Sequence, residues 1–273
     1  MQTAMPNTWN DVMSARAPIA IAPVIPLPLG RNGQSAPVAR AKLGCTACAM
    51  RKVCVTSELG SAGLDKFEDH AHSKRRIKAG ERLYRSGDLA TSLYTVRSGF
   101  IMTSAVARDG REQVTGFHVL GDIIGIDMIG GGRHSSDAVA LEDTEVCELS
   151  LTSVETLADE IPEVRRKLYR LIGEQFHYER DAMLLLGTMR AEERVASFLL
   201  NLGRRYESRG FSAKRFVLRM TRADIGSYLG LRLETVSRLF SRFQAEGLLH
   251  VENKSIEILN PEGLNLVIGS SVN

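Results

Sequence analysis

The sequence contains no uninterrupted apolar run of the roughly 18 residues that a membrane-spanning helix requires. An apolar stretch at residues 17–29 is interrupted by prolines, and it lacks the cationic start and the small-residue cleavage site of a signal peptide. We therefore expect no membrane association and a cytoplasmic location.

Cysteine is also scarce, with 4 among 273 residues. Three of them, Cys45, Cys48 and Cys54, follow a C-x2-C-x5-C spacing, and Cys147 lies far downstream. Because thiols are kept reduced in the cytoplasm, cysteines there are better explained by metal or redox chemistry than by structural disulfides.

Three interpretations of the four cysteines stay open. A structural zinc site usually takes paired ligands at short spacing, which this pattern lacks. Free or disulfide-switching thiols are a second possibility. An iron–sulfur cluster held by all four thiolates accounts for every cysteine and tolerates one remote ligand. We favour the cluster, which on a short loop would act as a sensor because its loss would change the packing beneath it.

The length allows about two domains, and the composition resembles that of a globular protein. The strand-like and helical patterns described below predict an α+β fold. The net charge of only +3 says little until it is located. From Lys214 to Lys254, eight Lys and Arg outnumber four Asp and Glu, so positive charge is concentrated near the C-terminus. The predicted organisation is a disordered tail (1–44), a cluster-binding loop (45–60), a β-barrel sensor domain (61–158), a dimerisation helix (159–190) and a winged helix-turn-helix DNA-binding domain (191–273).

Short β-type runs separated by glycine-bearing turns follow a short helix predicted at residues 61–69. Short strands separated by closely spaced turns are typical of an antiparallel barrel or sandwich. The clearest hairpin signal is Asp109-Gly110, since glycine supplies the positive φ of a tight turn. The predicted strands are 82–84, 92–96, 100–106, 113–117, 137–140 and 144–149.

A long amphipathic helix is predicted from Pro162, a residue that suits a first helical turn. Its apolar stripe recurs every three or four residues, which indicates either a coiled-coil dimer seam or packing against its own barrel. We favour the seam. The stripe comprises Val164, Leu168, Leu171, Gln175, Tyr178, Ala182, Leu185 and Met189.

The C-terminal domain carries the signals of a helix-turn-helix, after a first helix at residues 190–206. Thr221 and Asp224 form a plausible capping box, and Gly230 ends that helix. A second helix, at about 233–246, places Leu233, Val236, Phe240 and Phe243 inward. Residues 248–252 and 255–259 then read as a β-hairpin wing on the phosphate backbone.

The polar face of this second helix carries groups suited to reading bases. Arg238 can donate two hydrogen bonds to guanine, Glu234 can accept from cytosine, and Ser237 can make an adaptable contact. We expect no enzyme activity, because no catalytic arrangement of side chains stands out. The alternative is a regulator that responds to haem or a small ligand and has incidental cysteines. However, the candidate ligands His70, His72, His118 and His134 are expected to be core or surface residues.

These motifs together resemble a known family. The cysteine spacing, the segment DGREQVTGFHVLGDIIGID at 109–127, AEERVASFLLNL at 191–202 and ETVSR at 234–238 are similar to the oxygen-responsive fumarate and nitrate reduction regulators, within the cyclic-AMP receptor protein superfamily. The resemblance spans roughly residues 45–268. It implies a [4Fe–4S] cluster that oxygen converts to [2Fe–2S], a homodimer formed through the long helix, and TTGAT-type half-sites in double-stranded DNA. Carried over by motif, the cluster ligands are Cys45, Cys48, Cys54 and Cys147, and the base readers are Glu234, Ser237 and Arg238.

The resemblance implies two further roles. Asp181 on the long helix matches an acidic residue whose repulsion across the interface keeps the cluster-free form monomeric. The hairpin residues Asp109, Gly110, Arg111 and Glu112 match a surface that touches RNA polymerase. Residues 120–122 and 133–136 only loosely resemble the cyclic-nucleotide ligands of the superfamily, which disfavours cyclic-nucleotide binding, although Arg133 leaves that alternative open.

Overall fold

The computed structural model describes residues 44, 45, 48, 51, 54–70, 73–107, 109–126, 129 and 132–269. Nearly all of the predicted tail, residues 1–43, lies outside these described residues, as does His72. Within the described part of the chain, no helix is long and apolar enough to cross a membrane.

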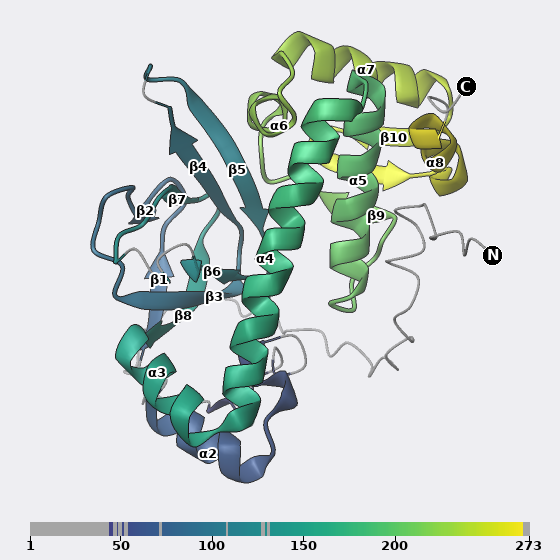
Figure 1. The fold of residues 1–273 in the computed structure, drawn as a ribbon. Coiled ribbons are helices and arrows are strands. Elements are labelled where there is room, and N and C mark those ends of the chain that lie inside the picture. Colours follow the sequence, from purple (N-terminus) through teal and green to yellow (C-terminus); the bar gives the residue numbers. More distant parts are fainter. Residues whose placement is uncertain are drawn as a thin grey trace, which may run out of the picture. The chain divides into compact units, whose positions relative to one another are not determined.

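Two four-stranded antiparallel sheets form the first part of the fold (Figure 1). Their orders are β1-β8-β3-β6 and β2-β7-β4-β5. The strands are β1 (Ser73–Ile77), β2 (Arg82–Tyr84), β3 (Ser92–Ser98), β4 (Ile101–Val106), β5 (Glu112–His118), β6 (Ile123–Ile124), β7 (Asp137–Ala140) and β8 (Thr144–Ser150). The two sheets contribute to one apolar core, which includes Leu83, Val96, Ile101 and Val146.

The predicted antiparallel β domain is thus confirmed, with two strands missed. Strand β1 reads SKRRI and has no apolar alternation, and β6 has only two residues, so neither gave a periodic signal. The predicted hairpin is present: Gly110, between β4 and β5, has a φ of 85°.

A cluster of helices packs beside the first sheet. It comprises the 3-10 turn η2 (Val55–Glu58), α2 (Ser61–His70), α3 (Leu151–Glu160) and the long α4 (Pro162–Thr188). Pro162 starts α4, as predicted. The separate helix α3 was not predicted; its N-cap is Ser150, whose hydroxyl accepts from the backbone N–H of Ser153 at 3.1 Å. Leu59, Leu64, Leu149 and Val164 share one apolar core, which connects the cysteine segment, the sheet and the start of α4.

The apolar stripe favoured as a dimer seam packs on its own chain at both ends of α4. Val164 and Leu168 belong to the helical core just described, and Leu185 packs against the C-terminal core. Another stripe of α4 is exposed: Tyr169 is 66%, Phe176 69% and Met183 74% accessible. The second interpretation of the predicted stripe, packing on its own chain, therefore holds at these ends.

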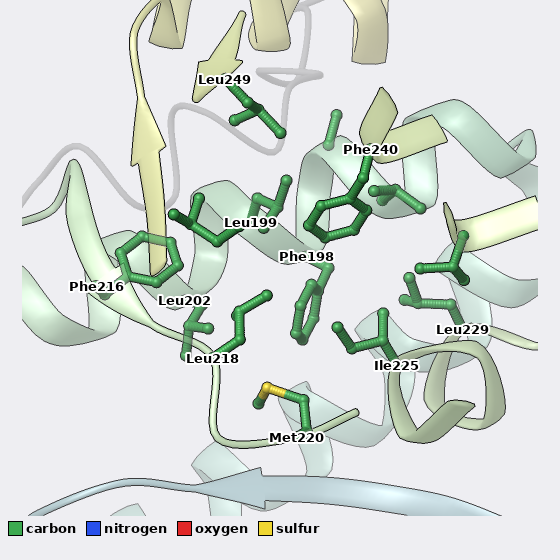
Figure 2. Packing of buried hydrophobic residues seen from close by; sticks show 14 of the residues in the cluster. Phe198, Leu199, Leu202, Phe216, Leu218, Met220, Ile225, Leu229, Phe240 and Leu249 are labelled. Atoms are coloured by element: carbon green, nitrogen blue, oxygen red, sulfur yellow. The ribbon is translucent and has the colours of Figure 1, made fainter. Parts of the chain in front are cut away.

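The C-terminal part is a winged helix-turn-helix domain, as predicted. Its elements are α5 (Ala191–Glu207), β9 (Arg215–Val217), α6 (Arg222–Leu229), α7 (Leu233–Ala245), β10 (Leu249–Glu252), β11 (Ser255–Ile258) and α8 (Pro261–Gly269). Figure 2 shows Phe198 and Leu202 of α5 packed with Ile225 of α6 and Phe240 of α7. Strand β9 and helix α8 were not predicted.

One predicted core position of α7 is wrong. Leu233 is 45% exposed, whereas Leu239, which we had not assigned inward, is buried together with Val236 and Phe243. Leu233 is the first residue of the helix, one turn before the buried face begins at Val236.

Candidate functional site: a DNA-reading helix and a four-thiol site

The turn that positions α7 has the predicted local chemistry. The hydroxyl of Thr221 accepts from the backbone N–H of Asp224 at 3.1 Å, and the Asp224 carboxylate accepts from the backbone N–H of Thr221 at 2.7 Å. This capping box starts α6. Gly230 ends α6 with a left-handed φ of 64°, a conformation that side chains with a Cβ rarely adopt. The chain can therefore turn sharply into α7.

Helix α7 presents the three predicted base readers together. Val236, Leu239, Phe240 and Phe243 are buried, whereas Glu234, Ser237 and Arg238 are all exposed. Residues three and four apart lie on the same side of a helix, so these three groups share one outward face. Among the described residues, no ion pair ties up Glu234 or Arg238. The face is free to meet base edges in a major groove.

Three cysteines lie on consecutive tight turns. The backbone N–H of Cys48 donates to the carbonyl of Cys45 at 3.2 Å, and that of Arg51 donates to the carbonyl of Cys48 at 3.1 Å. Cys54 then caps η2, with the N–H of Ser57 donating to its carbonyl at 3.0 Å. These turns keep the thiols of one short segment close together.

The fourth cysteine comes from the sheet. Cys147 lies in the middle of β8, a strand flanked by β1 and β3, and it pairs with Lys74 on one side and Thr95 on the other. All four cysteines are free thiols and half-buried. Cys45 packs against the helical core that also contains Leu149, two residues after Cys147. Strand β8 thus holds the Cys147 thiol rigidly, and the turns hold the other three thiols on one short segment.

The electrostatics of the thiols place them near one another. Burial, together with the nearby Cys54, Glu68, Cys147 and Cys48, raises the pKa of Cys45 to about 12. Burial likewise raises the pKa of Cys147 to about 11, with Cys54 and Cys48 adding to the rise and Arg97 and Lys74 opposing it. The structure thus brings the four predicted ligands together. Four thiolates in such surroundings need a cationic centre to stay ionised.

The donor set fits an iron–sulfur cluster. Within the described ranges, no three His, Cys, Asp or Glu side chains are arranged to hold one metal ion. A four-iron cluster takes one thiolate per iron, so its ligands surround a larger body and need not meet at one point. Cys45, Cys48, Cys54 and Cys147 would be those ligands.

Two of the candidate histidines have partners inside the fold, as expected. His118 is half-buried, its Nε2 lies 3.1 Å from the Thr103 hydroxyl, and loss of hydration lowers its pKa to about 4. His134 is buried and stacks on Tyr84, with ring centres 3.6 Å apart. Neither presents a free ring nitrogen on an open surface, which weakens the haem alternative.

The residues that loosely resemble nucleotide ligands form ion pairs and hydrogen bonds with other residues of the protein. The Asp122 carboxylate forms ion pairs with Arg205 and Arg209 of the C-terminal domain. Arg133 donates to the carbonyl of Gly87 at 2.5 Å. The ion pairs of Asp122 connect distant segments of sequence, and no local pattern predicts them.

The remaining predicted residues lie on two exposed elements. Asp109, Gly110, Arg111 and Glu112 sit at the tip of the β4–β5 hairpin, where Asp109 pairs with Arg111 at 2.8 Å. Asp181 lies on α4 beside Arg180, 3.4 Å from its guanidinium. The hairpin also makes a contact that sequence reasoning missed, because the N–H of Val114 donates to the Ser227 hydroxyl of α6 at 2.9 Å.

Residues 74–160 match the cyclic nucleotide-binding domain family, and residues 193–267 match the Crp-like helix-turn-helix domain family. The fumarate and nitrate reduction regulatory proteins of Escherichia coli K12 and Salmonella typhimurium are each 42% identical to this chain over 229 residues, which cover 84% of the chain and 92% of each relative. Electron transport regulator A of Shewanella oneidensis is 42% identical over 227 residues, covering 83% of this chain and 91% of its own.

Among solved structures, FixK2 from Bradyrhizobium japonicum superposes with a TM-score of 0.67 at 35% identity, covering 71% of this chain and 96% of FixK2. The two domain matches, the exposed polar face of α7 and the similarity over most of the chain all indicate a DNA-binding regulator. The chain is a transcription regulator with a helix-turn-helix DNA-binding domain rather than an enzyme, and it belongs to the fumarate and nitrate reduction regulator (FNR) family.

Proposed function

We propose that this chain is a cytoplasmic, oxygen-responsive transcription regulator. With a [4Fe–4S] cluster it would bind palindromic DNA as a homodimer, and oxidative loss of that cluster would switch it off. The observation that carries the proposal is the meeting of Cys45, Cys48 and Cys54 with Cys147, from a strand more than ninety residues further along the sequence. The names of the relatives support a role in regulating fumarate and nitrate reduction or electron transport.

The cluster, when bound, supplies an iron–sulfur group that oxygen attacks. The residues around it connect the thiols to α4. Glu58, four residues after Cys54, forms ion pairs with Arg170 and, at 3.7 Å, with Lys167 of α4. Leu59 packs with Val164 near the start of the same helix. Releasing the cysteine segment therefore changes what covers the first turns of α4.

The exposed stripe of α4 is the proposed dimer seam. Tyr169, Phe176 and Met183 recur every seven residues, and Leu186 follows at 39% exposure. Large apolar side chains this exposed along one side of a helix indicate an interaction surface. A heptad spacing suits the equivalent helix of a second copy related by twofold symmetry. We call these four residues the α4 stripe.

The acidic residue that opposes dimerisation is then better placed at Glu179 than at Asp181. Glu179 is exposed and lies three residues after Phe176 and four before Met183, on the flank of the α4 stripe. Asp181 is about 140° around the helix from Phe176, because each residue advances by about 100°. Its side chain is only 32% exposed and pairs with Arg180.

In DNA recognition, Glu234, Ser237 and Arg238 read a TTGAT-type half-site, and the β10–β11 wing contacts phosphate. The wing carries the exposed Lys254 at its turn, which supports the phosphate contact. Asp109, Gly110, Arg111 and Glu112 contact RNA polymerase, as their exposure on a projecting hairpin supports.

The proposal is tested on protein purified without air. We expect about four irons and four sulfides per chain, broad visible absorption, and DNA binding that disappears after exposure to air. A colourless protein with one zinc per chain overturns it. Cys147→Ala separates it from the haem or small-ligand alternative, because only a cluster-dependent regulator loses its response when that thiol is removed.

A further inference from the structure

Arg194 lies at the junction between α4 and the DNA-binding domain. It belongs to the first turn of α5, and Met189 and Arg190 connect α4 to α5 in an extended conformation. The Arg194 guanidinium donates three hydrogen bonds to backbone carbonyls. Its Nε donates to Met189 at 2.9 Å, its Nη2 to Leu186 at 2.8 Å and its Nη1 to Leu229 at 3.0 Å. One side chain thus joins α4, the connection to α5 and the end of α6.

Two of these carbonyls belong to the last turns of helices. Leu186 lies two residues before the end of α4, and Leu229 is the last residue of α6. The last carbonyls of an α-helix have no donor within the helix, and they form the negative end of its dipole. A planar guanidinium carries N–H groups that point in several fixed directions, so Arg194 can satisfy carbonyls of two helices at once.

The bond to Leu229 lies directly before the turn into α7. Gly230 begins that turn, and a Cβ added to it would lie 3.3 Å from Cδ2 of Leu186 and 3.4 Å from Nη1 of Arg194. The turn is therefore packed against both residues. Leu186 is also the last residue of the α4 stripe. The proposed dimer seam thus ends where the turn into α7 begins.

The connection between α4 and α5 is held by further contacts. The buried carboxylate of Glu193 accepts from the backbone N–H of Arg190 at 2.8 Å. Leu185, in the last turn of α4, packs against the C-terminal core. These contacts fix α5 to the connection, whereas the bond from Arg194 to Leu229 reaches α6.

We propose that Arg194 is a positioning residue that fixes α7 relative to the dimer seam and thereby sets the spacing between the two half-sites. The inference rests on the proposed homodimer. In a twofold dimer, the two α7 helices must be as far apart as the half-site centres, about 34–36 Å for one turn of DNA. Each added base pair moves the half-sites about 3.4 Å apart and rotates them by about 35°. A junction fixed by three bonds favours one spacing, and a loosened junction admits its neighbours.

The test compares palindromic DNA fragments that differ only in the spacing of two TTGAT-type half-sites. Binding to the anaerobic, cluster-bearing full-length protein is measured by fluorescence anisotropy at fixed salt concentration. The wild type is expected to prefer one spacing over its neighbours by about tenfold or more, the order of a mismatched base pair. Arg194→Gln should bind that fragment about tenfold more weakly, and its preference should fall to about threefold or less, because charge-assisted hydrogen bonds are lost.

Base discrimination separates positioning from a general loss of structure. Arg194 lies outside the polar face of α7, so Arg194→Gln should keep the wild-type ratio of affinities for half-sites with and without the guanine. A domain that unfolds would lose this ratio together with the spacing preference. Sedimentation and visible absorption check that the dimer and the cluster are retained.

Two further variants separate the geometry of the guanidinium from its charge. Arg190→Gln removes an exposed cation from the same connection, so a general effect of charge on DNA binding would appear there equally for all spacings. Its spacing preference should match that of the wild type. Arg194→Lys keeps the charge but places it at a single point, so it should relax the spacing preference as Arg194→Gln does.

An unchanged spacing preference in Arg194→Gln would overturn the inference, and so would a wild type that binds all spacings equally. A wild-type preference in Arg194→Lys would also overturn it, because charge alone would then account for the effect. If Arg194→Gln fails to fold, Arg194→Lys carries the test. A wild type that stays monomeric, or that binds none of the palindromes, would instead refute the proposed function, so the two failures are distinguishable.

Discussion

Asp122, in the turn between β5 and β6, forms an ion pair with Arg205 of α5. The two side chains are 15% and 19% exposed. Arg205 also donates to the carbonyl of Phe117 at 2.7 Å, and Arg209 forms a second ion pair with the same carboxylate. One buried carboxylate thus attaches the β domain to the first helix of the DNA-binding domain.

Replacing Asp122 with Asn should therefore be costly. The amide keeps the shape but leaves two largely buried guanidinium groups without a counter-charge, which typically costs about 3–5 kcal/mol. Urea unfolding of the wild type and Asp122→Asn measures the difference. Asp109→Asn, at the exposed hairpin tip, is the control and should change the free energy of unfolding little. Equal stabilities of Asp122→Asn and the wild type would show that the pair only offsets its own desolvation.

The same pair predicts a dependence on pH. Burial alone would raise the pKa of Asp122, but Arg205 and Arg209 more than offset it and hold the pKa below its ordinary value. A carboxylate whose pKa is depressed by folding contributes stability above its unfolded pKa of about 4 and loses it as the pH falls through the folded value. The stability difference between the wild type and Asp122→Asn should be full at pH 7 and shrink below pH 4. A constant difference from pH 7 to pH 3 would contradict this.

The elements predicted from sequence are those with local signals. The capping box of Thr221 and Asp224 starts α6, and Gly230 ends it. These signals act within a few residues, so the helix-turn-helix could be recognised from the sequence. Strand β1 gave no signal, because SKRRI pairs with β8 through its backbone and points its charged side chains outward. The pairs of Asp122 with Arg205 and of Cys147 with Lys74 join residues more than seventy positions apart. Such contacts depend on the assembled fold.

Helix α4 shows a different kind of ambiguity. Both sides of the helix carry apolar residues at helical spacing, one including Val164 and Leu185 and the other including Phe176 and Met183. Periodicity therefore located the helix but could not tell which stripe its own chain covers. Asp181, the predicted acidic switch, lies away from the exposed stripe that we propose as the dimer seam.

Assigning the acidic residue that opposes dimerisation to Glu179 or to Asp181 leads to different predictions. In the cluster-free protein, Glu179→Ala should increase the dimeric fraction, because it removes like charges that face each other across the α4 stripe of two copies. Asp181→Ala is the matched control and should leave the fraction unchanged. Sedimentation over a range of protein concentrations measures both. A stronger dimer in Asp181→Ala than in Glu179→Ala would restore the original assignment.

Arg238 offers the most direct test of base reading. Its side chain is exposed on the same face as Glu234, and a bidentate contact to guanine distinguishes bases by about tenfold or more. Arg238→Gln should weaken binding to a TTGAT-type palindrome and reduce discrimination at the guanine position, at fixed salt concentration. Arg242→Gln is the control from the same helix, since Arg242 is engaged with Glu246 at 2.8 Å. If Arg238→Gln instead weakens all sequences equally and lowers only the salt dependence, Arg238 contacts phosphate, and base reading falls to Glu234 and Ser237.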